Sequence, residues 1–104
     1  MKRRTADAEH LHDAVADLAQ ALVAVRDPDR MRAFLEDLCT PAELEAMSDR
    51  WRVVPLLLEG VPYREIHERT AVSVTTIGRV ARTLERGAGG YAAAIQGLGA
   101  TARS

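Results

Sequence analysis

The residues of this sequence best suited to chemistry lie on one predicted helix, from Val74 to about Arg86. Ile77, Val80 and Leu84 are spaced by three and four residues, the spacing of a buried helical stripe. The rest of this helix offers hydroxyl groups and slender arginines, which suit a DNA major groove about 12 Å wide. Threonine can contact base edges or the thymine methyl group, and arginine can pair with guanine or phosphate. The predicted DNA-reading face consists of Val74, Thr75, Thr76, Gly78, Arg79 and Arg82.

A second short helix is predicted directly before the reading helix, from Pro62 through Thr70, with Ile66 facing inward. Ala71 and Val72 form a tight turn, and Ser73 caps the reading helix. Two helices joined by a three-residue turn are the helix-turn-helix pattern, which places its second helix in the major groove. The residues of the earlier helix expected to reach backbone phosphates are Arg64, His67 and Arg69.

Two residues depart from the usual helix-turn-helix pattern. Ala71 occupies the turn position where glycine is favoured, and a left-handed turn there would cost about 1 kcal/mol. His67 replaces a small residue that usually packs between the two helices. Without DNA binding, the same residues would form an ordinary helical hairpin with an exposed basic face.

Charge is distributed unevenly along the chain, although the net charge is only −1. Residues 1–4 carry +3, residues 5–49 carry −8, residues 50–86 carry +3 and the remainder carries +1. A basic N-terminal arm and a basic C-terminal module beside an acidic body favour an anionic partner for the two basic parts.

The segment before the basic module predicts helices that pack against a partner helix. Leu11, Val15, Leu18, Leu22 and Val25 follow a 4-3-4-3 spacing within a helix from about Thr5 to Val25. An average spacing of 3.5 residues is typical of a helix-on-helix seam. Since about a hundred residues make a thin core for a monomer, we expect an oligomer in which this helix packs against a partner helix.

Capping residues mark the next helices. Asp27 and Pro28 begin a second helix, and the run from Thr40 to Glu43 is a capping box that opens a third. Gly60 ends the third helix as a left-handed cap. The predicted buried stripe of this third helix is Leu44, Met47, Trp51, Val54 and Leu58, with Pro55 expected to kink it or loosen one turn. A short helix is expected after Gly90, with frayed residues from Gly99 onward.

Composition excludes several classes of protein. The chain has 104 residues, one cysteine, and no apolar run near the roughly 20 residues that cross a bilayer. The lone Cys39 excludes a disulfide scaffold and fits a reducing cytoplasm. Lys2 is the sole lysine, and His10 and His12 fall on different helix faces, so neither a buried catalytic lysine nor a histidine metal pair is expected. An enzyme is therefore disfavoured. A helical protein-interaction module without DNA binding stays open as the alternative.

The stretch from Thr40 to Leu84 resembles the Trp-repressor superfamily through TPAELEAMSDRWRVVPLLLEG and REIHERTAVSVTTIGRV. The similarity is greatest to its YerC/YecD group, through YREI, TTIGRV and the GGY that follows. The resemblance implies an all-α homodimer of five to six helices with intertwined N-terminal helices. Two reading heads would meet successive major grooves of a near-palindromic site, about 34 Å apart. It thus implies a transcriptional regulator of double-stranded DNA, acting as a repressor.

The resemblance also raises the question of a corepressor. The residues that surround bound tryptophan in the Trp repressor match Thr40, Arg50 and Arg79. Val80 stands where the Trp repressor has glycine and would crowd an indole ring. We therefore expect no cofactor, with L-tryptophan or another small effector as the less favoured alternative.

The predicted organisation is one helical domain over residues 1–104. It comprises a basic arm (1–4), dimerisation helices (5–60), a helix-turn-helix (62–86) and a short C-terminal helix with a tail (87–104).

Overall fold

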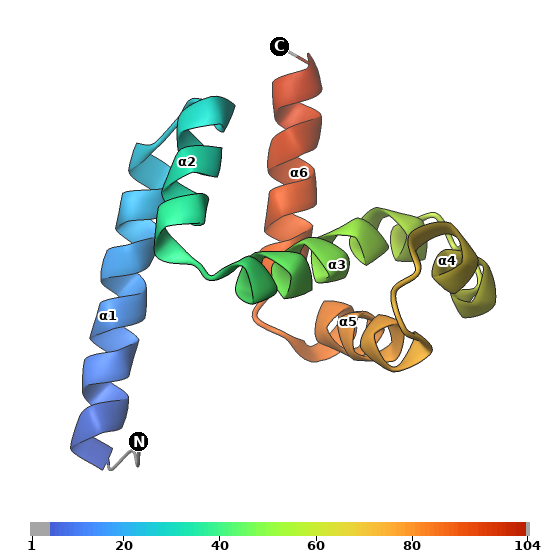
Figure 1. The fold of residues 1–104 in the computed structure, drawn as a ribbon, viewed down its shortest axis with the longest axis horizontal. Helices are drawn as coiled ribbons and strands as arrows, with labels where there is room; N and C mark the ends of the chain where they lie inside the picture. Colours follow the sequence, from blue (N-terminus) through green and yellow to red (C-terminus); the bar gives the residue numbers. More distant parts are fainter. Residues whose placement is uncertain (1–4, 104) are drawn as a thin grey trace. The chain divides into compact units, whose positions relative to one another are not determined.

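The computed structural model describes residues 5–103, with side chains for residues 8–99. This part of the chain is all-helical, as predicted, and contains no strand (Figure 1). The predicted basic arm at residues 1–4 lies outside the described residues. No helix within the described range is long and apolar enough to cross a membrane. The six helices are α1 (Thr5–Ala24), α2 (Pro28–Leu38), α3 (Pro41–Leu58), α4 (Tyr63–Thr70), α5 (Val74–Arg86) and α6 (Gly90–Arg103).

Local capping chemistry sets the helix ends. The Asp27 carboxylate accepts a hydrogen bond from the Arg30 backbone N–H at 2.9 Å, and Pro28 occupies the first turn of α2. Gly60 has φ +81°, and the N–H groups of Gly60 and Val61 donate to carbonyls of the last turn of α3. This is a Schellman cap, which requires a left-handed residue, so the predicted role of Gly60 is confirmed. The helix α3 runs through Pro55 without interruption.

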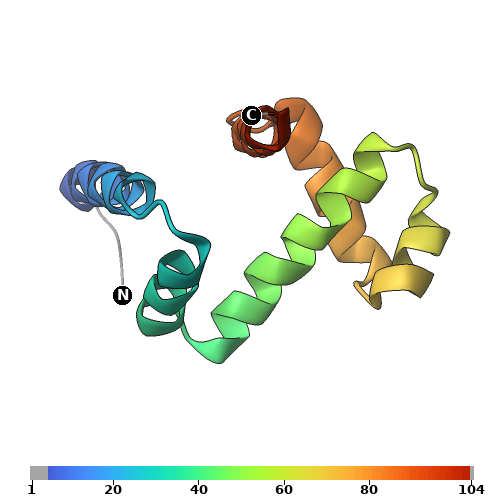
Figure 2. The same ribbon diagram turned by 90° about the horizontal axis from the view of Figure 1, so that it is seen from above.

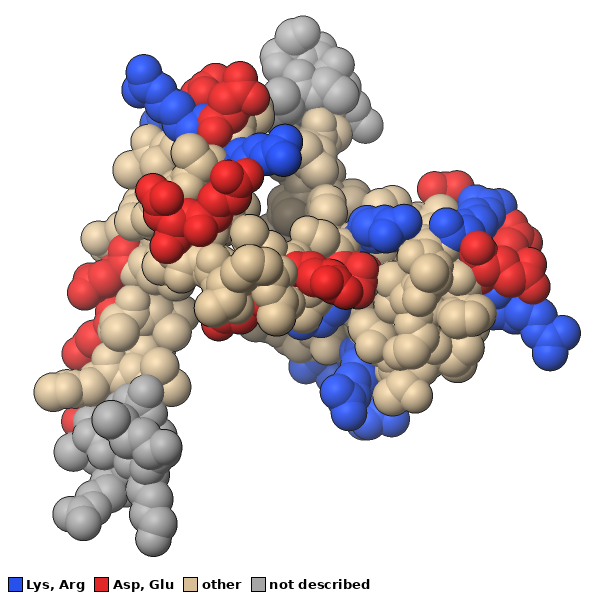
Figure 3. Space-filling model, in the orientation of Figure 1, with Lys and Arg blue, Asp and Glu red and all other residues tan. Residues whose placement is uncertain are grey.

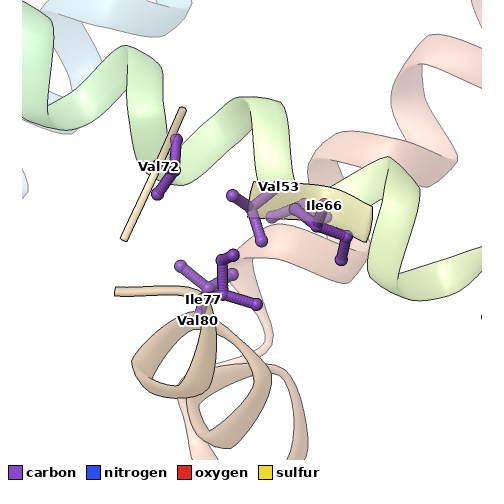
Figure 4. Close-up of a cluster of buried hydrophobic side chains, with 6 residues drawn as sticks. Val53, Ile66, Val72, Ile77 and Val80 are labelled. Carbon is purple, nitrogen blue, oxygen red and sulfur yellow. The ribbon is translucent and has the colours of Figure 1, made fainter. Parts of the chain in front are cut away.

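The chain divides into two compact units, Met1–Pro41 and Ala42–Ser104. The second unit holds the six buried apolar residues found among the described residues. Figure 2 shows α3 crossing α5, and Figure 4 shows Ile77 and Val80 of α5 directed toward Val53 of α3 and Ile66 of α4. The buried cluster is Val53, Val54, Ile66, Val72, Ile77 and Val80.

The buried face of α3 differs from the predicted stripe. Val53, which was not predicted, is fully buried beside Val54, whereas Met47 is 40% exposed and Leu58 is 55% exposed. Two consecutive residues are buried because α3 packs against both short helices, and the side chains of Val53 and Val54 point about 100° apart on the helix. A single stripe spaced by three and four residues describes contact with one neighbour only.

The helix α6 is longer than predicted. It runs from Gly90 to Arg103, so the segment from Gly99 onward, predicted as a tail, continues the helix. Tyr91 and Ile95 pack against the core, and the Tyr91 ring lies 6.5 Å from the Trp51 ring, centroid to centroid. These contacts anchor its first two turns, and alanine, the residue with the best helix propensity, is frequent along it.

The first unit has little core of its own. No described residue of α1 or α2 is fully buried. On α1, the seam residues Leu11, Val15 and Leu18 are 46%, 55% and 37% exposed. A helix whose apolar stripe is exposed to this degree lacks the packing that normally stabilises helices in water.

Candidate nucleic-acid interface

The helices α4 and α5 form the predicted helix-turn-helix. Ala71 ends α4 in the left-handed region, with φ +64° and ψ +5°, so the turn has the strained geometry expected from the sequence. The Thr70 hydroxyl donates to the Ile66 carbonyl at 2.7 Å and accepts from the Val72 N–H at 3.1 Å. These bonds, together with the buried Val72 side chain, fix the path of the chain between the two helices.

Ser73 caps α5 as predicted. Its hydroxyl oxygen accepts from the Thr76 N–H at 3.1 Å and lies 3.0 Å from the Thr76 hydroxyl, to which it donates. Thr76 is half-buried, so its hydroxyl belongs to the cap as well as to the predicted reading face. The structure therefore places Thr76 at the edge of this face, with its hydroxyl already bonded inside the protein.

The other predicted reading residues lie together on the surface of α5. Val74 is 51% exposed, Thr75 and Arg79 are exposed, and Gly78 is half-exposed between them. A concave surface collects these residues with Arg82 and Arg86. We call this surface the α5 face. It is lined by Tyr63, Val74, Thr75, Gly78, Arg79, Ala81, Arg82, Glu85 and Arg86.

Tyr63 was not predicted as part of the site. It is the first residue of α4, is 42% exposed, and lines the α5 face from the neighbouring helix. An exposed tyrosine at a helix N-terminus offers a hydroxyl donor and an apolar ring, a combination common at binding surfaces. In the sequence, its position directly before Arg64, a predicted phosphate contact, could have identified Tyr63 as part of the site.

Most arginines of α4 and α5 form no ion pair within the described residues and can bind a ligand. Of those in α4 and α5, only Arg69 forms an ion pair, with Glu65 of the same helix. The predicted phosphate contact of Arg69 would have to compete with this pair, whereas Arg64, Arg79 and Arg82 have no acidic partner within the described residues. In the view of Figure 3, basic side chains project around α4 and α5 with some acidic ones among them near α4, and acidic side chains predominate over α1 and α2.

Gly78 leaves open space on the α5 face. A Cβ atom built on it would meet no heavy atom within 4 Å, so no packing inside this protomer requires a glycine. Glycine in a helix interior is less favourable than alanine by about 1 kcal/mol. The absence of a side chain at this point allows another molecule to approach the backbone of α5 closely.

The three candidate effector residues divide between the two units. Arg50 on α3 and Arg79 on α5 are exposed and belong to the second unit, whereas Thr40 precedes α3 and belongs to the first. Val80, expected to crowd an indole, is 1% exposed and is part of the core.

The fold and the α5 face define a helix-turn-helix protein. Residues 13–98 match the family described as Trp repressor protein, and the chain belongs to this family. It is 33% identical to the YerC protein of Bacillus subtilis (strain 168) over 78 residues, and this aligned stretch covers 75% of each chain. The crystal structure of a TrpR-like protein from Eubacterium eligens ATCC 27750 matches with a TM-score of 0.77 and 39% identity, covering 84% of this chain and 90% of that one.

These matches confirm the predicted superfamily and its YerC-like group. Membership indicates a DNA-binding regulator, and the fold is one of regulatory proteins, not of enzymes.

Proposed function

We propose that this protein is a sequence-specific transcriptional repressor that reads double-stranded DNA through α5, as a cytoplasmic homodimer. The observation that carries the proposal is the α5 face itself. It combines exposed hydroxyl and guanidinium groups without acidic partners and a glycine that leaves the helix backbone accessible. These are the groups that read base edges and phosphates in a major groove.

The residues that we propose to contact DNA divide into two roles. Thr75 and Arg79 lie in the first turns of α5, the part of a recognition helix that contacts base edges. Arg64 at the start of α4 and Arg82 further along α5 would contact phosphates, and the Tyr63 hydroxyl would donate to the same DNA backbone. Thr76 lies at the edge of the predicted reading face, where its hydroxyl accepts the bond from Ser73 and keeps its own hydrogen to donate, and its methyl group can contact an apolar base edge.

Dimerisation is supported by the apolar surface that the single chain leaves uncovered. The seam of α1 is spaced for packing against another helix, yet its residues Leu11, Val15 and Leu18 are 46%, 55% and 37% exposed. A second copy would cover this seam and present two reading helices to successive major grooves of a near-palindromic operator. The acidic charge of residues 5–49 would keep the dimerisation helices away from the DNA phosphates.

We also propose that DNA binding needs no corepressor. The support is that Arg79 is exposed on the α5 face, where its guanidinium can bind a phosphate or a base directly, without a ligand between them. Isothermal titration with L-tryptophan tests this directly. Saturable heat at micromolar ligand, lost in the Arg50→Ala variant, would show instead that Thr40, Arg50 and Arg79 form an effector site.

The DNA proposal is tested by titrating labelled duplexes with the wild-type protein and with Arg79→Ala at several salt concentrations. For a DNA-binding protein, affinity should fall steeply between about 50 and 200 mM salt, because binding releases condensed counterions. Arg79→Ala should weaken binding to preferred sequences more than to random ones. The matched control is Arg32→Ala on α2, an arginine ion-paired to Glu36 at 2.9 Å outside the α5 face. Salt-insensitive binding, or equal loss in both variants, would contradict the proposal.

A further inference from the structure

The side chain of His67 crosses the turn of the helix-turn-helix. Its Nδ1 atom lies 2.7 Å from the Val72 carbonyl oxygen, a separation typical of a strong hydrogen bond. A carbonyl oxygen can only accept, so Nδ1 must carry the hydrogen and donate it. In the neutral ring, Nε2 then holds a lone pair and cannot donate to a phosphate.

Val72 is thus held to α4 through both of its backbone polar groups. Its N–H donates to the Thr70 hydroxyl at 3.1 Å, and its carbonyl accepts from His67. Its side chain is 4% exposed in the core, and the next residue, Ser73, is the N-cap of α5. The position of Val72 therefore sets where α5 begins, and in what direction it leaves α4.

We infer that His67 is a positioning residue for DNA reading and not a phosphate contact. The turn needs such support because Ala71 adopts the left-handed conformation, which an L-residue other than glycine enters only at a free-energy cost. The His67 bond closes the turn across this strained residue. This inference rests on the proposed DNA-binding function and changes the role that the sequence assigned to His67.

Three substitutions separate the two ring nitrogens. In His67→Asn, the amide nitrogen can occupy the place of Nδ1 and still donate to Val72. In His67→Gln, the longer side chain carries its amide to the place of Nε2, and His67→Ala removes both groups. Affinity for a preferred duplex is measured by fluorescence anisotropy across a salt series, at a temperature where circular dichroism shows every variant folded.

The expected result is a loss of about tenfold in affinity for His67→Ala and His67→Gln, equivalent to about 1.4 kcal/mol. His67→Asn should retain affinity close to that of the wild type, and the salt dependence should not change in any variant. A merely stabilising role would lower the melting temperature without moving the affinity of the folded protein. Full affinity in His67→Ala, rescue by Gln and not by Asn, or a salt slope reduced by about one would overturn the inference.

Nitrogen-15 NMR of the His67 ring in the DNA-free protein tests the role of His67 separately from the proposed DNA-binding function. The expected neutral tautomer carries its hydrogen on Nδ1, with a scalar coupling across the bond to the Val72 carbonyl. The Nε2–H tautomer would overturn the inference, even if DNA binding is confirmed. If the wild-type protein binds no duplex, the proposed function fails, and with it the role of His67 in DNA reading, even where the ring bond is observed.

Discussion

Replacing Gly78 by alanine should stabilise the protein and weaken its DNA binding at the same time. Gly78 lies inside α5, and an added Cβ atom would meet no heavy atom within 4 Å. Alanine is more favourable than glycine in a helix interior by about 1 kcal/mol, and here no clash subtracts from this gain. The free energy of unfolding should therefore rise by about 1 kcal/mol, which corresponds to roughly 4–8 °C in melting temperature for a domain of this size.

The same methyl group should lower DNA affinity because it projects from the α5 face. Adding a methyl or methylene group to a closely packed contact typically costs about 1–3 kcal/mol. At about 1.4 kcal/mol per factor of ten, this predicts roughly a 5-fold to 150-fold loss. Urea unfolding and anisotropy on one preferred duplex measure the two effects.

The matched control is Gly99→Ala on α6, where a Cβ atom also meets nothing within 4 Å. It should raise stability without lowering DNA affinity, because Gly99 lies outside the α5 face. If Gly78→Ala raises stability but leaves affinity unchanged, DNA does not approach α5 at this residue, and the docking proposed above is wrong. A fall in stability would instead refute the view that Gly78 is free of packing constraints.

Three further substitutions test other parts of the account. Arg64→Ala should weaken binding to all duplexes about equally and reduce the salt slope by about one, since it removes a phosphate contact; a changed sequence preference would argue for base reading. Leu18→Glu should disfavour dimer formation by about 3–5 kcal/mol by burying an unpaired charge, whereas Gln20→Glu on the opposite side of α1 should not; sedimentation velocity tells them apart. Ala71→Gly should raise the free energy of unfolding by about 0.5–1 kcal/mol, because the left-handed strain that glycine relieves in the folded state exceeds the conformational entropy that glycine adds to the unfolded chain. A lower free energy of unfolding in urea would refute this balance.

Features determined by neighbouring residues were predictable from the sequence. Asp27, Ser73 and Gly60 each act on backbone groups within a few residues, so their roles as caps follow from residue type and spacing. The buried stripe of α5 was predicted for the same reason, with Ile77 and Val80 in the core. The position of the turn at Ala71 followed from the helix-turn-helix spacing, whereas its left-handed conformation was considered only as a possibility with a free-energy cost.

Features that depend on the angle between helices were not predictable. Val53 is buried because α3 meets more than one neighbour, and Tyr63 reaches the α5 face because α4 begins beside it. The bond from His67 to Val72 spans five residues and forms only when the turn has its final shape. Thr76 is different, because the bond that its hydroxyl accepts from Ser73 joins residues only three apart, and the residue type alone predicted base reading.

Selection of random duplexes by the purified protein tests the central claim most directly. If two copies read DNA through α5, the enriched sequences should contain two inverted half-sites with centres one helical turn apart, about 34 Å along the duplex. Thr75→Ala should change the bases preferred within each half-site while keeping their spacing. A pool without enriched sequences, or one with a single unrepeated site, would contradict the account of a dimeric, sequence-specific DNA-binding regulator.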